Sequence, residues 1–453
     1  MTDLSGLSIA GRVVLPSDYD WDEVRQGQNL AVDMHPEAVA YPESADDVSK
    51  VVRFAREQGL KVTGQSTGHG SPALPPLDGT ILIKTDRMRE VSIESGTHTA
   101  RVAAGVRAPE LGIEAIKHGL CFLPGSSPTV GVTGYTLGGG LGWLARKHGF
   151  ACNHVRAFEV VNADGQIRQV DSKTNPDLFW ALRGGGGGYA IVTALHLELL
   201  PIPDVYAGVL IFPAELGAPA IRAYRDWTEK VPEELTSNLR FLRPPPLPTV
   251  PEPLRDKPLI VIGVCYIGSE SDGEKLIKPI RKIGDRILDT VATIPTNGLS
   301  RIAMDPEDPV PSMGHHAVLR ELPDEAIEAF VGAAGPDAGS PLLLADLRHA
   351  GGALGRPAEG GGALAKLDAA FVMNGIGVPM DPKMAPAIEE GLDRLIDAMK
   401  PWVGEGGYFN FADRPCDVSV ILPDEICSRL AQVKRSWDPE NVILANHSVS
   451  VGP

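Results

Sequence analysis

The stretch from Pro124 to Trp143 reads PGSSPTVGVTGYTLGGGLGW. Seven of its twenty residues are glycines, namely Gly125, Gly131, Gly134, Gly138, Gly139, Gly140 and Gly142. An interior glycine costs a helix roughly 1 kcal/mol relative to alanine, so we predict that this stretch is not helical. Apolar residues alternate with the glycines, which is not typical of a linker. We interpret the stretch as a backbone that passes close to a large, flat ligand, because glycines leave space and free N–H groups.

Length, composition and charge narrow the class of protein. The chain has 453 residues, 43% of them hydrophobic and 22% charged, which predicts a globular protein of two or three domains. Its net charge of −16 argues against nucleic acid or an anionic membrane as partner. A phosphate ligand would therefore be held by backbone N–H groups and helix N-termini. The sequence has no apolar run of 18 residues and no signal-peptide pattern, so we expect a cytoplasmic protein without a membrane span.

Metal and disulfide chemistry are not predicted. The five cysteines are scattered, odd in number and without CxxC spacing, which argues against a disulfide framework or a zinc site. We interpret Cys121 and Cys152 as buried apolar residues. The sequence contains no phosphate-binding GxxxxGK[ST] loop and no HExxH motif.

The part of the chain before Pro201 alternates strand and helix patterns. Ser44 is a typical helix N-cap with Asp47 three residues on, and apolar residues at helical spacing continue up to Gly59. Residues 1–35 are expected to be an irregular leader that docks through Tyr19, Trp21 and neighbouring valines. Further helices are expected over 109–118 and 177–183, and strands over 38–41, 61–63, 80–84, 99–103, 157–161, 166–170 and 189–200. The last strand is expected to have one solvated face.

After Pro203 the pattern changes, and we place a domain boundary there. Strand-like runs at 207–212, 258–267 and 369–378 alternate with helical patterns at 218–230, 272–283 and 384–399. This predicts an α+β domain with an antiparallel sheet. The chain ends with GYFNFAD at 407–413 and a helix over 424–436.

Part of the glycine stretch resembles the glycine fingerprint of dinucleotide-binding proteins. Gly140 to Ala145 matches GxGxxA, but the residues before it are glycines rather than an apolar strand. Glu159 begins the following strand instead of ending it. A nicotinamide site of the Rossmann type therefore does not fit this context.

Five motifs in order carry a resemblance to a known family: TGQSTGHG, LPGSSPTVGVTGYTLGGGLGWLARKHG, DLFWALRGGGGGYAIVTALHLEL, GYFNFAD and SWDPENVILANHSV. They resemble the berberine bridge enzyme-like flavoproteins of the vanillyl-alcohol oxidase and p-cresol methylhydroxylase superfamily. The match runs from about Pro36 to Val449 and is loose over 205–400. It implies an α+β, two-domain FAD-binding fold, in which both chain ends form the FAD domain and a central antiparallel sheet forms the substrate domain. The implied boundaries are a leader packed on the FAD domain (1–35), the FAD-binding domain (36–204), the substrate domain (205–404) and the return to the FAD domain (405–453).

The resemblance implies FAD as cofactor. The loop Gly64–Gly70 corresponds to the family's pyrophosphate loop, and His69 to the histidine that many members attach to the flavin 8α-methyl group. The alternative is that His69 packs beside the ring without a bond. The implied cofactor-binding residues are Gly64, Gln65, Ser66, Thr67, Gly68, His69, Gly70, Gly125, Ser126, Ser127, Val130, Gly131, Thr133, Gly134, Gly138, Gly140, Leu141, Trp143, Gly188, Ile191, Val192 and Asn410.

Two residues of the glycine stretch bear on the flavin chemistry. Ser127 stands where doubly attached members have a cysteine, and serine supplies no thiolate, so attachment through His69 only is expected. Val130 corresponds to the position beside the carbon that reacts with dioxygen, and a valine there favours an oxidase. A flavin dehydrogenase that does not use O2 is the alternative, as is a valine that only packs in a strand.

The resemblance implies that an alcohol, sugar or natural-product substrate gives a hydride to flavin N5, and that O2 accepts the electrons to give H2O2. A small-molecule substrate and O2 are the expected partners, and the oligomeric state is left open. Tyr408 and then Tyr135 are the catalytic candidates, while Phe411 stands where relatives have a second tyrosine. Weaker candidates are Asp346, Arg348 and His349, which are expected to be paired structural residues, and the adjacent His315 and His316 are expected on the surface. A non-catalytic flavin-binding protein is the alternative from another class.

Overall fold

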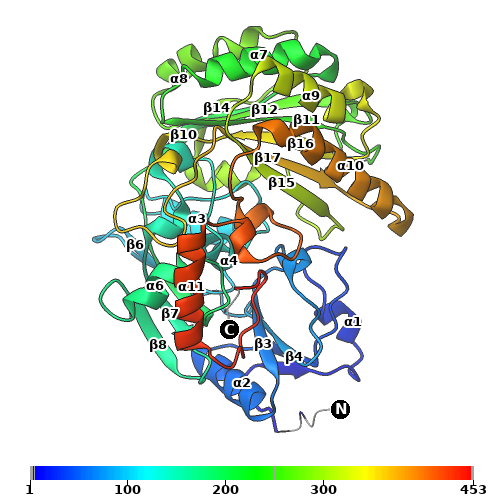
Figure 1. Ribbon diagram of the computed structural model, residues 1–453. Coiled ribbons are helices and arrows are strands. Elements are labelled where there is room, and N and C mark those ends of the chain that lie inside the picture. Colours follow the sequence, from blue (N-terminus) through cyan, green and yellow to red (C-terminus); the bar gives the residue numbers. More distant parts are fainter. Residues whose placement is uncertain (1–3, 5, 249, 450–453) are drawn as a thin grey trace.

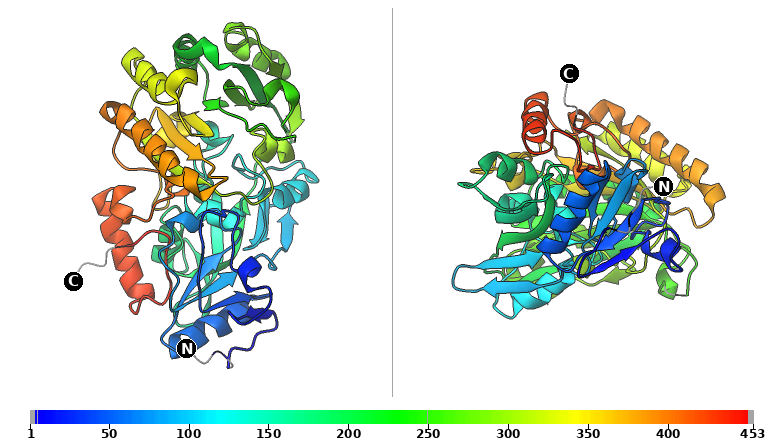
Figure 2. Two further views of the ribbon diagram at one scale, coloured as in Figure 1. Left: turned by 90° about the vertical axis from the view of Figure 1, so that its right-hand side faces the viewer. Right: turned by 90° about the horizontal axis from the view of Figure 1, so that it is seen from below.

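The computed structural model describes residue 4 and residues 6–248 and 250–449. Within these ranges the strands form three sheets, and the molecule is elongated (Figures 1 and 2). The largest sheet and its helices occupy one end, and the two smaller sheets with both chain termini occupy the other. Residues from the two ends of the chain thus share one half of the molecule.

A mostly parallel sheet leads the chain into the first glycine-rich loop. Strand β4 lies between β2 and β3 and is parallel to both, while β1 pairs antiparallel with β2. Helix α2 begins as predicted, since the hydroxyl of Ser44 accepts a hydrogen bond of 3.2 Å from the Asp47 N–H. The bounds are β1 (Arg12–Val14), β2 (Ala38–Tyr41), α2 (Ala45–Glu57), β3 (Lys61–Gln65) and β4 (Thr80–Lys84).

The second sheet is antiparallel, in the order β5–β6–β9–β7–β8. The predicted hairpin at Asp164–Gly165 joins β7 to β8, which is confirmed. The expected solvated face of β9 is wrong: β9 lies between β6 and β7, and only His196 and Glu198 are half-buried. The bounds are β5 (Val91–Glu94), β6 (Thr99–Ala103), α3 (Ala108–Ile116), β7 (Val155–Val161), β8 (Ile167–Asp171), α6 (Pro176–Leu182) and β9 (Ile191–Glu198).

The third sheet has eight antiparallel strands, as predicted for the middle of the chain. Its order is β13–β10–β12–β11–β16–β17–β15, and β14 also pairs with β10. Four helices cover its outer face, α7 (Gly217–Thr228), α8 (Glu270–Ile277), α9 (Asp324–Ala334) and α10 (Ala385–Met399) (Figure 1). The strands are β10 (Asp204–Pro213), β11 (Leu235–Leu242), β12 (Leu259–Tyr266), β13 (Leu288–Asp289), β14 (Ala292–Pro295), β15 (Met313–Leu319), β16 (Leu344–His349) and β17 (Phe371–Gly377).

The N-terminal leader is not irregular throughout. Residues Arg12–Val14 form β1, and a short helix α1 (Trp21–Val24) follows. Val14 is fully buried, and Trp21 packs against the same small apolar cluster. Tyr19 is 97% exposed, so the expectation that it docks on the domain is wrong.

The end of the chain returns to β3 and is held there by a buried ion pair. Helix α11 (Asp424–Trp437) packs against α6, and Leu444 N–H then donates to the Val62 carbonyl at 2.8 Å. Lys434 Nζ donates to Asp438 at 2.6 Å and to the carbonyls of Gly188 at 2.7 Å and Ile443 at 2.8 Å. The side chains of Lys434 and Asp438 are 6% and 0% exposed. The Lys434 side chain thus connects α11, the glycine-rich segment Gly184–Gly188 and the C-terminal segment at Ile443.

Some features are absent from the described residues. None of their helices has the length and apolar character needed to cross a membrane. All five cysteines are unpaired, as expected, and Cys121 and Cys152 are buried. The described ranges hold no group of three or more side chains suited to a metal ion.

The Lys434–Asp438 pair predicts a large effect of one substitution. Lys434→Met leaves the Asp438 carboxylate buried without its cation, which should lower the free energy of unfolding by about 3–5 kcal/mol. Urea unfolding of the cofactor-free protein measures this change. The matched control is Arg56→Gln, which breaks the exposed pairs of Arg56 with Glu440 and Asp164 and should leave the free energy of unfolding nearly unchanged. Equal losses in the two variants would contradict this account of how the C-terminal segment is held.

Candidate functional site

The loop after β3 presents four consecutive backbone N–H groups without a partner. In the described part of the chain, the N–H groups of Thr67, Gly68, His69 and Gly70 donate no hydrogen bond. Gly68 has a φ of +83°, and a Cβ there would lie only 2.7 Å from the Gly27 Cα. Free N–H groups in such a loop attract an anion, which suits a phosphate in an acidic protein.

His69 lies beside the glycine stretch. Its Nε2 is 2.8 Å from the Thr129 hydroxyl, which is 3.2 Å from the Ser127 hydroxyl. Burial lowers the pKa of His69 to about 4, and the positive charge of Arg107 adds to this shift. The imidazole is therefore neutral at physiological pH, with one N–H and one lone pair.

The loop and the glycine stretch approach each other too closely for side chains. A Cβ at Gly131 would overlap the Ser66 hydroxyl, so a larger residue there would displace the loop. Several polar atoms around this contact are buried and have no hydrogen-bond partner among the described residues: Gln65 Oε1, Ser66 Oγ and Thr133 Oγ1. Unsatisfied buried polar atoms are costly, and a polar ligand at this position would satisfy them.

Part of the glycine stretch is helical, which corrects the prediction. Val132–Leu137 forms the short helix α4, and a second helix, α5 (Ala145–His148), follows the stretch. Only Gly134 lies inside α4, where the helix tolerates a single glycine. The helix ends at Gly138, after which Gly139 and Gly140 adopt φ angles of +112° and +83°. The glycines thus end the helix and allow a sharp return.

After Gly140 the chain turns back, and its backbone packs against the backbone at the start of the glycine stretch. A Cβ at Gly142 would overlap the carbonyl oxygen of Pro124, so the two ends of the stretch touch. Gly125 and Gly140 lie against the ring of Tyr135, at 3.0 Å and 2.9 Å from their Cβ positions. The stretch therefore forms a closed loop around Tyr135.

The glycine-rich segment Gly184–Gly188 contacts the glycine stretch and the C-terminal segment. Gly186 N–H donates to the Leu137 carbonyl at 3.1 Å, at the end of α4. Gly188 leaves no room for a side chain because of Ala445 in the C-terminal segment, at 2.5 Å from its Cβ position. On β9, Ile191 packs 3.6 Å from the Cβ position of Gly64, and Val192 beside it is buried. Three segments distant in sequence thus converge.

Tyr408 and Asn410 reach the glycine stretch from the C-terminal part of the chain. The Tyr408 hydroxyl accepts hydrogen bonds from the Leu141 N–H at 2.6 Å and from Asn410 Nδ2 at 2.9 Å. Asn410 Nδ2 also donates to the Tyr135 carbonyl at 2.9 Å. Burial raises the pKa of Tyr408, whereas these two N–H donors oppose the shift. The Tyr135 hydroxyl is buried without a partner in the described residues.

A row of polar side chains crosses the eight-stranded sheet on the face opposite its helices. The neighbours of these residues in each strand belong to the core beneath the helices, so strand alternation turns the row toward the other half of the molecule. The polar row is in register and consists of Arg240 on β11, Asp346 on β16, Asn374 on β17 and His316 on β15.

Two hydrogen bonds connect this face of the sheet to the predicted site residues. Arg348, on the same face, donates from Nη1 to the Ser126 hydroxyl at 3.3 Å. The Tyr408 N–H donates to His316 Nε2 at 2.9 Å. His316 is therefore half-buried at the junction of the two halves, and its expected surface position is wrong.

Asp346 and Arg348, two of the weaker catalytic candidates, pair with each other. Arg348 Nε donates to Asp346 at 2.7 Å, and Asn238 Nδ2 donates to the second oxygen of Asp346 at 2.9 Å. The Arg348 guanidinium lies 4.7 Å from the centre of the Phe411 ring. His349 points elsewhere, against Phe371. The sequence analysis missed Asn238 and Arg240, which alternate with Leu239 and Phe241 on β11, and Asn374, which stands among apolar residues and glycines on β17.

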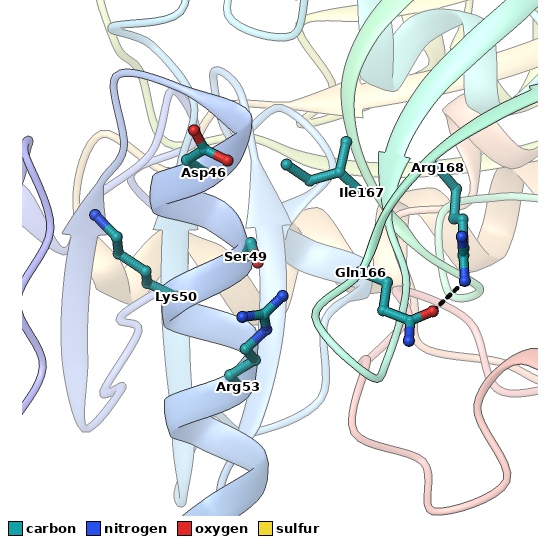
Figure 3. A pocket seen from close by; sticks show the side chains of 7 residues that line it. All are labelled: Asp46, Ser49, Lys50, Arg53, Gln166, Ile167 and Arg168. Atoms are coloured by element: carbon teal, nitrogen blue, oxygen red, sulfur yellow. Dashed lines mark hydrogen bonds between the residues drawn. The ribbon is translucent and has the colours of Figure 1, made fainter.

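Trp143 is a predicted site residue that contacts the large sheet. It packs against β12, where a Cβ at Gly263 would lie 2.6 Å from its ring. Its indole N–H is buried without a partner in the described residues. A surface groove of about 510 Å³ lies elsewhere, between α2 and the β7–β8 hairpin (Figure 3). None of the predicted site residues lines this groove, so we do not assign the function to it.

Comparisons with known proteins agree with this geometry. Residues 36–171 match the FAD binding domain family. The chain is 27% identical to (R)-6-hydroxynicotine oxidase of Paenarthrobacter nicotinovorans, over 98% of this chain and 97% of that protein. It is 33% identical to the FAD-linked oxidoreductase pytB of Aspergillus terreus, over 61% of this chain but only about a third (33%) of that protein's length. The fold matches the solved structure of Physcomitrella patens BBE-like 1, with a TM-score of 0.85, 19% identity and 98% of each chain covered.

Fold and sequence together define an FAD-binding, α+β oxidoreductase fold, which confirms the predicted fold class. Residues 36–171 thus carry an FAD-binding domain, the chain is similar in sequence to FAD-linked oxidoreductases, and its fold is that of the BBE-like 1 structure.

The contact between Gly142 and Pro124 predicts that a single methyl group disrupts the site. In Gly142→Ala the new Cβ meets a backbone oxygen, so the loop must shift; we expect a loss of about 1–3 kcal/mol in the free energy of unfolding and weaker FAD binding. Gly332→Ala in α9 is the matched control, because its Cβ meets nothing within 4 Å. Urea unfolding and titration of the cofactor-free protein with FAD measure both effects. Indistinguishable variants would show that the close approach is not needed.

Proposed function

We propose that this chain is an FAD-dependent oxidase of a polar, hydroxyl-bearing small molecule. The observation that carries the proposal is the hydrogen bond between Arg348 and Ser126, which sets the polar face of the large sheet against the glycine stretch. A substrate between these two surfaces would meet Asp346, Arg348 and Asn374, which are hydrogen-bonding groups rather than an apolar wall. Alcohols and sugars offer the hydroxyl groups that such a wall recognises.

The cofactor would be held mainly by backbone groups. We propose that the free N–H groups of the loop 67–70 bind the pyrophosphate, and that Ser66, Gln65 and Thr133 satisfy their buried oxygens on the same cofactor. Bound FAD would supply the hydride-accepting chemistry, which no side chain provides. Residues 36–204 and 405–453 would form the FAD domain, and residues 205–404 the substrate domain. We further propose attachment through His69 only, because Ser127 lacks a thiol.

Tyr408 is the residue that we propose to move the substrate proton. Burial raises the pKa of Tyr408, and two N–H donors, from Leu141 and Asn410, point at its oxygen and oppose that rise. The positive charge of Arg348 acts in the same direction. The protein would thus orient the substrate, exclude water and accept the hydroxyl proton at the Tyr408 oxygen.

The proposal is tested by oxygen uptake on a panel of alcohols, sugars and apolar amines. We expect H2O2 formation with a polar substrate, and loss of most activity in Tyr408→Phe with FAD binding retained. Substrate-dependent reduction of a dye without oxygen uptake would identify a dehydrogenase instead. A flavin that no substrate reduces would identify a non-catalytic flavin-binding protein.

The side chain of Val130 should determine whether the reduced flavin passes its electrons to O2 or to other acceptors. It is half-buried and packs in the cluster that contains Tyr135 and Trp143. Val130→Ile adds one methylene group, which should slow reoxidation by O2 by about tenfold or more. Stopped-flow reoxidation measures this rate, and dye reduction by the same substrate serves as the control that should stay unchanged. An equal loss with both acceptors would show that Val130 only packs.

A further inference from the structure

The hydroxyls of Thr129 and Ser127 form a short hydrogen-bonded chain that ends on His69. The distances are 2.8 Å from His69 Nε2 to Thr129 Oγ1 and 3.2 Å from there to Ser127 Oγ. Thr129 is buried, with 4% of its surface exposed. His69 Nδ1 makes no hydrogen bond to any residue of the described ranges. The two ring nitrogens of His69 therefore have different environments.

We infer that Thr129 is a positioning residue for flavin attachment, which directs the bond to His69 Nδ1 and removes the Nε2 proton through Ser127. This inference rests on the proposed attachment at His69. A neutral imidazole has one N–H and one lone pair, and a hydrogen-bond partner on one nitrogen selects the tautomer. With Thr129 accepting from Nε2–H, the nucleophilic lone pair is on Nδ1.

The surroundings keep the ring in the neutral form that attack requires. Burial disfavours the imidazolium, and Arg107 is the charged group that acts on the ring in the same direction. No carboxylate accepts a hydrogen bond from His69 in the described residues. A carboxylate at the position of Thr129 would stabilise the imidazolium and remove the lone pair, whereas a neutral hydroxyl does not.

The attachment step balances with dioxygen as the oxidant. A bond forms between Nδ1 and the 8α carbon, and one C–H bond of the 8α-methyl group breaks. The electron pair of that C–H bond reduces the flavin, and the methyl proton and the Nε2 proton are released. Dioxygen then takes the two electrons and two protons to give H2O2, which restores the oxidised flavin.

The hydroxyl of Thr129 can hydrogen-bond His69 both before and after the flavin is attached. Before attachment Thr129 accepts from Nε2–H, and after loss of that proton the same hydroxyl can rotate and donate to Nε2. Ser127, at 3.2 Å, is the next group on the route of the proton. The hydroxyl of Ser127 thus completes the hydrogen-bonded chain from His69. Ser127 has this role in addition to excluding a second flavin bond through a thiol.

The test is the rate at which cofactor-free protein, produced under riboflavin limitation, forms acid-stable flavin after addition of FAD. Thr129→Val removes the hydroxyl at nearly equal volume and should slow attachment by about tenfold or more, while non-covalent FAD binding is retained. Thr129→Ser should restore the rate, and Ser127→Ala should give a smaller loss. Thr193→Val is the control, because it removes a buried threonine hydroxyl of β9 that bonds the Glu159 carbonyl instead.

The possible outcomes distinguish a failure of the role inferred for Thr129 from a failure of the proposed attachment at His69. Wild-type protein without acid-stable flavin overturns the His69 attachment itself, and the inference with it. Attachment that is as fast in Thr129→Val as in wild type, or a flavin peptide linked through Nε2, overturns the role of Thr129 alone. Loss of non-covalent FAD binding in Thr129→Val also overturns it, since Thr129 would then be a cofactor-binding residue. If Thr129→Val does not fold, an unchanged rate in Ser127→Ala overturns the proton route.

Discussion

The close approach of other segments to the backbone at Gly131 and Gly142 is the constraint on which the rest of the structure depends. At each position a Cβ would overlap an atom that lies on a distant or returning segment, Ser66 or Pro124. Removing side chains lets three loops converge and leaves N–H groups free, which gives an acidic chain a local positive potential. The sheets hold these loops in place, and Lys434 locks the C-terminal segment onto them.

The junction between the two halves is polar along one part of the large sheet and apolar along another. On β11, β16 and β17, strand alternation sends apolar side chains to the helices and polar ones to the glycine stretch, whereas β10 and β12 pack apolar side chains against Tyr135 and Trp143. The pairing of Asp346 with Arg348 keeps these buried charges balanced, and Asn238 satisfies the remaining carboxylate oxygen. These bonds hold the side chains of Asp346 and Arg348 in one orientation, so that they can orient a substrate without reorganisation.

Much of the fold followed from local sequence signals. The Ser44 cap, the Asp164–Gly165 turn and the apolar periods of the strands act within a few residues, so their predictions were confirmed. The sequence analysis did not predict helix α4. It weighed all seven glycines of the stretch against a helix, whereas only Gly134 lies inside the helical turns. Tyr19 and β9 were misjudged because exposure depends on neighbours distant in sequence. Of the site, the glycine-rich segments and Tyr408 could be anticipated from motifs. The polar row could not be, since it exists only through the register of four strands.

The central claim is that the loop of His69 and the glycine stretch together hold FAD, with His69 as the single point of attachment. The most direct measurement is mass spectrometry of peptides from acid-precipitated wild-type protein. We predict that the yellow flavin stays with the precipitate and maps to the peptide that contains His69, and that the peptide containing Ser127 carries none. Flavin released entirely to the supernatant, or bound to any other residue, would contradict this account.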